Sequence, residues 1–267
     1  MGKALVTDVG SIVDPSATVF GACTAGTGST FTVRNFSLQS TAELIDMWYN
    51  GVTKGAVRIR SPKFADNVQG IRVNVAGGLQ AFLLDPEAGQ QLIPQDTLAV
   101  EAIGGTTETD TVAMQSYYDD LSGAAPVLKM PSDILGTMEF LDTWVVNTTA
   151  PATVGAIGGT AITNLYDVSQ ANRWYACLGY VTDTALTAIG LTGADLSNLN
   201  VMGPGDTTAF RVRRYFADLS VKLGKPCIPC FNTANKGNTQ VVTADKVAST
   251  TADVSLIVAI MPASWTP

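Results

Sequence analysis

Few residues of the kinds that carry out enzymatic chemistry occur here in a useful arrangement. The chain of 267 residues contains no histidine, which excludes Ser-His-Asp and Cys-His catalytic systems and zinc sites built on imidazole. Two pairs of carboxylates could perform acid–base catalysis, namely Glu108 with Asp110 and Asp119 with Asp120. We expect instead that both pairs belong to one helix. Glu108 and Asp110 would lie in its first turn, where the helix dipole stabilises negative charge, and Asp119 and Asp120 would lie on its exposed face near the end. The sequence therefore predicts no catalytic residue and no enzyme.

Cys227 and Cys230 form the one Cys-x-x-Cys pair. Such a pair is redox-active when it begins a helix in a thioredoxin-like α/β context. Here it follows a predicted helix and lies in a strand-like segment that contains proline. Cys23 and Cys177 are not spaced to complete a zinc site with it. We therefore predict ordinary buried thiols, no disulfide framework, no metal site and no cofactor.

Arg211, Arg213 and Arg214 are the nearest approach to a basic cluster in a chain of net charge −7. We consider them candidate contacts to a neighbouring subunit, or to an anionic lipid or nucleic acid. The alternative is a solvated helix face that pairs with Asp206 or Asp218. Because phosphate contacts need clustered cations, so acidic a chain is not expected to bind nucleic acid sequence-specifically.

The overall composition is rich in hydrophobic residues and poor in charge. Hydrophobic residues make up 46% of the chain and charged residues only 15%, against about 25% charged in typical soluble domains. Such a surface suits a protein covered by copies of itself, and equally a weakly charged secreted protein. No apolar run is long enough for a membrane helix, and Asp8 and Asp14 interrupt any signal-peptide core.

Alternating apolar and polar residues predict strands throughout the chain. The predicted strands are 31–38, 57–60, 71–75, 79–84, 97–103, 127–130, 138–146, 174–181, 185–191, 199–202, 225–231, 240–243 and 253–261. Short helices are predicted at 41–49, at 109–121 and from Asp206 or Thr207 to Leu223, where Gly224 provides the C-cap.

Two stretches, 97–123 and 197–224, resemble each other at a constant offset. Gly105 then aligns with Gly203, and Asp-Leu-Ser at 120–122 aligns with the same triplet at 218–220. This match predicts two copies of one strand–turn–helix unit. Segment 147–161 has no charge and contains proline and paired glycines, which is typical of a linker. The predicted organisation is an N-terminal arm (1–30), a first unit (31–146), a linker (147–161) and a second unit (162–267).

This order of elements predicts an all-β protein, with two jelly-roll β-sandwiches in tandem, each with a short inserted helix. Two β-rich halves of this kind resemble the double jelly-roll major capsid proteins of tailless icosahedral bacteriophages and related viruses. The resemblance covers most of residues 31–261 and rests on that architecture and on the match of YYDDLS with YFADLS.

The resemblance implies a virion structural protein, a major capsid subunit that assembles in the host cytoplasm. It implies a homotrimer whose six jelly rolls form a pseudo-hexagonal tile of an icosahedral shell. Its partners would be copies of itself, other virion proteins such as a vertex protein, and the internal lipid membrane that many such viruses enclose. Arg211, Arg213 and Arg214 would then be subunit or inner-face contacts.

Other functions stay open at this point. A tailed-phage capsid, tube or decoration subunit is one alternative, although a long spine helix or long extended loop is not obvious here. A carbohydrate-binding or adhesive β-sandwich would need exposed aromatic residues, whereas Trp48, Trp144 and Trp174 have the pattern of core or strand residues. A hydrolase with two carboxylates is the enzymatic alternative.

Overall fold

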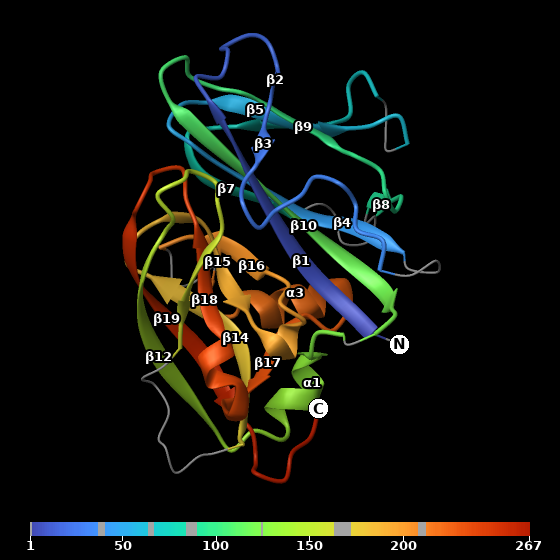
Figure 1. Ribbon diagram of the computed structural model, residues 1–267, viewed down its shortest axis with the longest axis vertical. Coiled ribbons are helices and arrows are strands. Elements are labelled where there is room, and N and C mark those ends of the chain that lie inside the picture. Colours follow the sequence, from blue (N-terminus) through green and yellow to red (C-terminus); the bar gives the residue numbers. More distant parts are fainter. Residues whose placement is uncertain are drawn as a thin grey trace.

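The protein is a stack of β-sheets. The computed structural model describes residues 2–36, 41–63, 67–83, 90–123, 125–162, 172–207 and 212–267. Within them the strands form four antiparallel sheets, which we number I to IV in the order in which they stack. Figure 1 shows the first half of the chain above the second, with the long pair β1 and β10 running diagonally across the upper half.

The first half of the chain forms sheets I and II. Sheet I has the order β2 (Gly21–Ala22), β9 (Ala99–Ile103), β5 (Gly55–Arg60) and β6 (Ile71–Val75). Sheet II has the order β3 (Thr24–Ala25), β1 (Gly2–Val13), β10 (Thr109–Leu121), β4 (Ala42–Gly51) and β7 (Gly78–Leu83), and β8 (Gln90–Leu92) also pairs with β4.

The second half forms sheets III and IV. Sheet III has the order β13 (Gly158–Ala161), β18 (Gln240–Ala244), β15 (Leu186–Thr192) and β16 (Val201–Gly205). Sheet IV has the order β11 (Leu128–Lys129), β17 (Ile228–Asn232), β14 (Trp174–Thr182), β19 (Thr251–Ile260) and β12 (Phe140–Thr149). The helices are α1 (Pro131–Leu135) and α3 (Tyr215–Leu223), with 3-10 turns η3 (Ala194–Leu196) and η4 (Thr233–Asn238).

Both halves have the same strand connectivity. Without the short strands β3, β8 and β11, the strands of each half can be numbered in chain order. Sheets II and IV then both have the order 1-8-3-6, and sheets I and III both have the order 2-7-4-5. Two antiparallel sheets connected in this way form a jelly roll. The chain is therefore two jelly rolls in tandem, as predicted. The first ends with β10, and the second begins with β11.

Sheet II is covered on both faces, which makes the two jelly rolls one body. On one side, residues such as Met47, Tyr118 and Val57 form a core with sheet I. On the other side, Trp48 and Ala113 pack with residues of sheet III in a smaller cluster. Sheets III and IV enclose the largest core, which also takes in side chains from sheet II.

Two of the predicted helices are strands. Of residues 41–49, all but the first belong to β4, and residues 109–121 form β10; these two strands pair in the middle of sheet II. Almost every residue of both strands is buried, because both faces of this sheet are covered. A strand of that kind lacks alternation, and its apolar pattern cannot be distinguished from that of a buried helix. The strands predicted at 57–60 and 71–75, which have one solvated face, are confirmed as β5 and β6.

The predicted repeat is wrong in detail. Stretch 97–123 contains β9 and β10, whereas 197–224 contains β16 and α3, so the aligned residues occupy different places in the two jelly rolls. Gly203, which aligns with Gly105 in the predicted strand–turn–helix unit, lies within β16 and not in a turn. Helix α3 ends at the predicted Gly224, whose φ is 62°. The connection at the same position in the first jelly roll, between β6 and β7, is only Ala76 and Gly77, so among the described residues this position carries a helix in the second half alone.

The predicted arm and linker are also corrected. Within the predicted arm, Gly2–Val13 is β1, which lies between β3 and β10 in sheet II. The predicted linker 147–161 begins inside β12 and ends in β13. Small uncharged residues such as Thr148 and Gly159 are therefore parts of strands whose partners lie far away in the sequence. Among the described residues, no helix has the length and apolar character needed to cross a lipid bilayer.

Polar side chains join sheet II to the second jelly roll. Gln115 donates to the carbonyl of Met202 over 2.5 Å, and the Thr7 hydroxyl donates to the same carbonyl over 3.0 Å. The hydroxyl of Tyr215 lies 3.0 Å from Gln115 Oε1 and 3.2 Å from Asp46 Oδ2. Tyr215 thus connects α3 to two strands of sheet II.

Trp48 anchors the same interface and is completely buried. Its Nε1 donates to the carbonyl of Thr187 in sheet III over 2.5 Å. We expect W48A to lower the free energy of unfolding by about 3–5 kcal/mol, because it removes the ring and leaves a cavity. W48F should cost less, since it keeps an aromatic ring and loses mainly the hydrogen bond. Urea denaturation measures both, and equal stability of W48A and wild type would contradict the role of Trp48.

Asp46 should make stability depend on pH. Burial raises the pKa of Asp46 to about 8, against the opposing effect of hydrogen bonds from the Met47 amide and Tyr215. The folded state therefore holds this proton more tightly than the unfolded chain, and the contribution is largest in acid. We expect the unfolding free energy of wild type, relative to D46N, to fall by up to about 1.4 kcal/mol per pH unit between about pH 4 and about pH 8.

The measurement is urea denaturation of wild type and D46N at both ends of this pH range. Burial also raises the pKa of Asp110, to about 6, but that residue is present in both proteins and its effect cancels in the comparison. A difference between the two proteins that is the same at both pH values would show that Asp46 keeps its charge when folded.

Candidate functional site

The outward face of sheet IV carries the site that includes the predicted arginines. In β12, Trp144, Val146 and Thr148 are buried, and the residues between them are exposed. Because side chains alternate along a strand, Leu141, Thr143 and Val145 point away from sheet III. Thr143 pairs with Ile257 of β19, which in turn pairs with Gly179 of β14. These strands form the floor of a pocket.

Gly179 and Val212 position the two arginines. Val212 is buried in the core of the second jelly roll. A side chain at Gly179 would come within 2.4 Å of the Val212 carbonyl and 2.6 Å of Arg213. Because Gly179 has no side chain, the segment before α3 can lie directly on β14. Arg213 and Arg214 are exposed and follow this anchor immediately.

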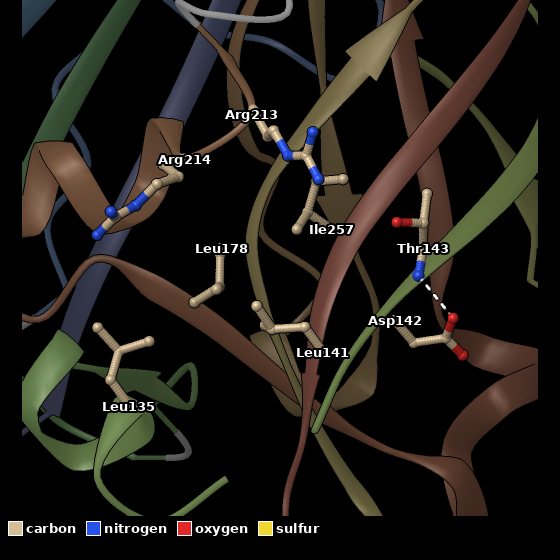
Figure 2. Close-up of a pocket in the computed structure, with 8 residues that line it drawn as sticks. All are labelled: Leu135, Leu141, Asp142, Thr143, Leu178, Arg213, Arg214 and Ile257. Carbon is tan, nitrogen blue, oxygen red and sulfur yellow. Dashed lines mark hydrogen bonds between the residues drawn. The ribbon is translucent and has the colours of Figure 1, made fainter. Parts of the chain in front are cut away.

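The pocket has a volume of about 320 Å³ and an apolar interior (Figure 2). Leu178 and Ile257 are only 3% and 7% exposed and form its floor. Leu135 of α1 and Leu141 of β12 are 41% and 51% exposed and form its sides. A volume near 300 Å³ is at the lower end for ligand sites, so it fits a small group or one or two side chains of a neighbour.

The charged groups around the pocket differ in how many hydrogen bonds and ion pairs they form. Asp142 accepts hydrogen bonds from the Thr143 amide (2.7 Å) and from Trp144 Nε1 (3.1 Å). Arg214 has a loose ion pair with Asp218 over 3.8 Å, with both side chains more than half exposed. Arg213 makes no hydrogen bond or ion pair with any residue that the structure describes. Figure 2 shows the guanidinium of Arg213 beside Ile257 and that of Arg214 directed away from it.

The arrangement can hold an acidic group next to an apolar one. Arg213 and Arg214 supply positive charge, and the leucines supply an apolar surface with which a methyl or aromatic group can pack. The structure thus places two of the three predicted arginines in one pocket, and Arg211 lies outside the described residues. The sequence analysis did not predict the apolar part of the pocket. The only sequence signal for it was that Leu141 falls on the opposite face of the strand from Trp144 and Val146.

The cysteines are buried, free thiols. Cys227 directly precedes β17 and Cys230 lies within it. Burial raises the pKa of all four thiols, that of Cys23 and Cys177 to about 12. Because thiolates are the reactive form, this confirms the prediction that the Cys-x-x-Cys pair is an ordinary pair of core residues.

The carboxylate pairs lie near opposite ends of β10. Glu108 precedes β10 and accepts hydrogen bonds from the amides of Val52, Thr53 and Gly105, and from the Thr53 hydroxyl. Asp110, inside β10, accepts a hydrogen bond from Tyr49 over 2.8 Å.

At the other end of β10, Asp119 forms ion pairs with Lys3 and Lys225. The predicted helix dipole is absent, so these carboxylates fix loops and strand ends instead. Among the described residues, no group of three or more acidic or cysteine side chains is placed to hold a metal ion.

Comparison with known proteins gives only distant likenesses. No family model matches the chain, and no curated protein matches it. Among solved structures, it is similar to the PBSX exported protein XepA, with 12% identity, a TM-score of 0.24, and 96% of this chain and 86% of that one covered.

A second similar structure is the STIV MCP, with 8% identity, a TM-score of 0.22, and 98% and 97% of the two chains covered. A third is Cucumber Leaf Spot Virus, with 12% identity, a TM-score of 0.17, and 99% and 92% covered. TM-scores below 0.5 do not establish a common fold, so the architecture described above rests on the strand order of this chain alone.

The arginines of the pocket should contribute little to stability. We expect R213A and R214A each to change the free energy of unfolding by no more than about 0.5 kcal/mol, since both side chains are exposed. G179A should cost more, because its methyl group would displace the Val212 backbone. Urea denaturation compares the three variants. A large loss in R213A or R214A would show that the arginines hold the fold together rather than serve as a contact surface.

Proposed function

We propose that this protein is a structural subunit of a virion and builds a shell by binding copies of itself. The observation that carries the proposal is the tandem pair of jelly rolls, identical in strand order and fused through a sheet that is buried on both faces. Jelly rolls are widely used in viral capsids, and a rigid double unit offers two similar sets of outer surfaces for repeated contacts.

The composition of the chain supports the same proposal. Only 15% of the residues are charged, which lowers the cost of covering large surfaces in an assembly. The pocket with Arg213 and Arg214 is a contact point for an acidic and apolar segment of a neighbouring subunit. We assign it no catalytic role, and the protein no enzymatic one.

More specifically, we propose that the protein is a major capsid subunit. Three copies would form a trimer, and its six jelly rolls would tile an icosahedral shell assembled in the host cytoplasm. Other virion proteins, such as a vertex protein, and an internal lipid membrane would be its further partners. Sequence-specific nucleic acid is not among the proposed partners, because the chain has a net charge of −7.

The test is the assembly state of the full chain after expression. We expect light scattering to detect trimers and larger particles, and electron microscopy of negatively stained fractions to show closed shells or flat hexagonal arrays. W48A, which loosens the joint between the jelly rolls, should assemble poorly. A monodisperse monomer that forms no larger species at any concentration would refute the proposal.

A further inference from the structure

Strand β12 forms an open edge of sheet IV. It pairs with β19 over its full length, Phe140–Thr149, in one continuous register without a bulge. No strand in the described part of the chain pairs with its other side. Ten residues of strand at a sheet edge offer a row of unpaired backbone groups to another strand.

The register identifies the open backbone groups. The Ala150 amide donates to the Thr250 carbonyl over 2.8 Å, which continues the ladder with β19. Antiparallel ladders alternate between residues that bond to the partner strand and residues that point away. The residues that point away are therefore Leu141, Thr143, Val145, Asn147 and Thr149. The Thr143 amide, which bonds to the side chain of Asp142 over 2.7 Å, agrees with this assignment.

The equivalent edge of the first jelly roll is closed by the chain itself. Strand β1 occupies the same position in sheet II as β12 occupies in sheet IV. Its outer side pairs with β3 at Gly10 and Ser11, and the Val9 carbonyl accepts a further bond from Gly26. The two jelly rolls thus share a strand order but differ at this edge.

The edge of β12 also lacks the features that usually prevent strand pairing. Natural edge strands are protected by lysine, proline, bulges or short length. β12 contains no lysine, arginine, proline or glycine, and its one charged residue is Asp142. Leu141 and Val145 are each 51% exposed, so both the backbone and the side chains favour a partner strand.

We propose that β12 pairs antiparallel with β12 of a second copy of this chain, about a two-fold axis, so that two copies of sheet IV become one continuous sheet. Such an axis makes the same edge complementary to itself. When the axis passes through Val145, Thr143 lies opposite Asn147 and Leu141 opposite Thr149. Asp142 then faces Thr148, so no two like charges are opposed across the junction.

The biological role of this contact rests on the proposed function, in which it is one of the self-contacts of the shell. The first experiment is sedimentation of the full chain over about 1 µM to about 1 mM. We expect a reversible dimer in wild type. V145K should raise its dissociation constant at least about tenfold, because the two introduced charges would face each other across the axis. V221K is the matched control and should leave dimerisation unchanged, since Val221 is exposed on α3, which packs on β14 and β17.

A crosslinking experiment tests the register and does not depend on V145K folding normally. The four native cysteines are buried and free. Mild oxidation of V145C should therefore give a disulfide-linked dimer, whereas V221C should not. A wild type that stays monomeric over the whole range, equal association of V145K and V221K, or equal crosslinking of V145C and V221C would each overturn the inference.

The outcomes also separate this inference from the proposed function. If V145K forms particles as well as wild type does, the function stands and the β12 contact is refuted. If no particles form but the dimer is lost in V145K alone, the contact stands and the virion role is refuted.

Discussion

The burial of sheet II on both faces is the constraint on which the rest of the structure depends. A sheet in a two-layer sandwich can place polar residues on its outer side, but β1, β4 and β10 cannot. Polar side chains on the face towards the second jelly roll find partners there, as Gln115 does with Met202 and as Asp46 does with Tyr215. Unpaired polar groups in such a layer would be costly. The jelly rolls are therefore held in one fixed relation.

The two ends of the stack also differ chemically. Sheet I presents charge to solvent, since Arg58 and Arg60 pair with Glu101 across neighbouring strands. Sheet IV presents leucine, valine and threonine, with Arg213 and Arg214 at the border of an apolar pocket. Both outer faces belong to one rigid body, so a contact made by one of them fixes the orientation of the other.

The apparent repeat shows how sequence resemblance can mislead. Stretches 97–123 and 197–224 share a glycine, a pair of aromatic residues and Asp-Leu-Ser, but one contains a buried strand and the other a helix. The two stretches in fact contact each other, because Gln115 donates to the Met202 carbonyl and accepts a hydrogen bond from Tyr215. The match therefore does not mark two copies of a single unit. The real duplication is in strand order, which needs no sequence identity.

The sequence by itself determined the elements whose environment is local. Strands with one solvated face, such as β5 and β6, show the alternation that water on one side and core on the other impose. The end of α3 at Gly224 and the inert cysteines were also predictable from neighbouring residues alone. Only the tertiary structure decided that 41–49 and 109–121 are strands, that Leu141 joins Arg213 in a pocket and that β12 is an open edge. Each of these depends on what lies across a layer or beside a strand, and the partners come from distant parts of the chain.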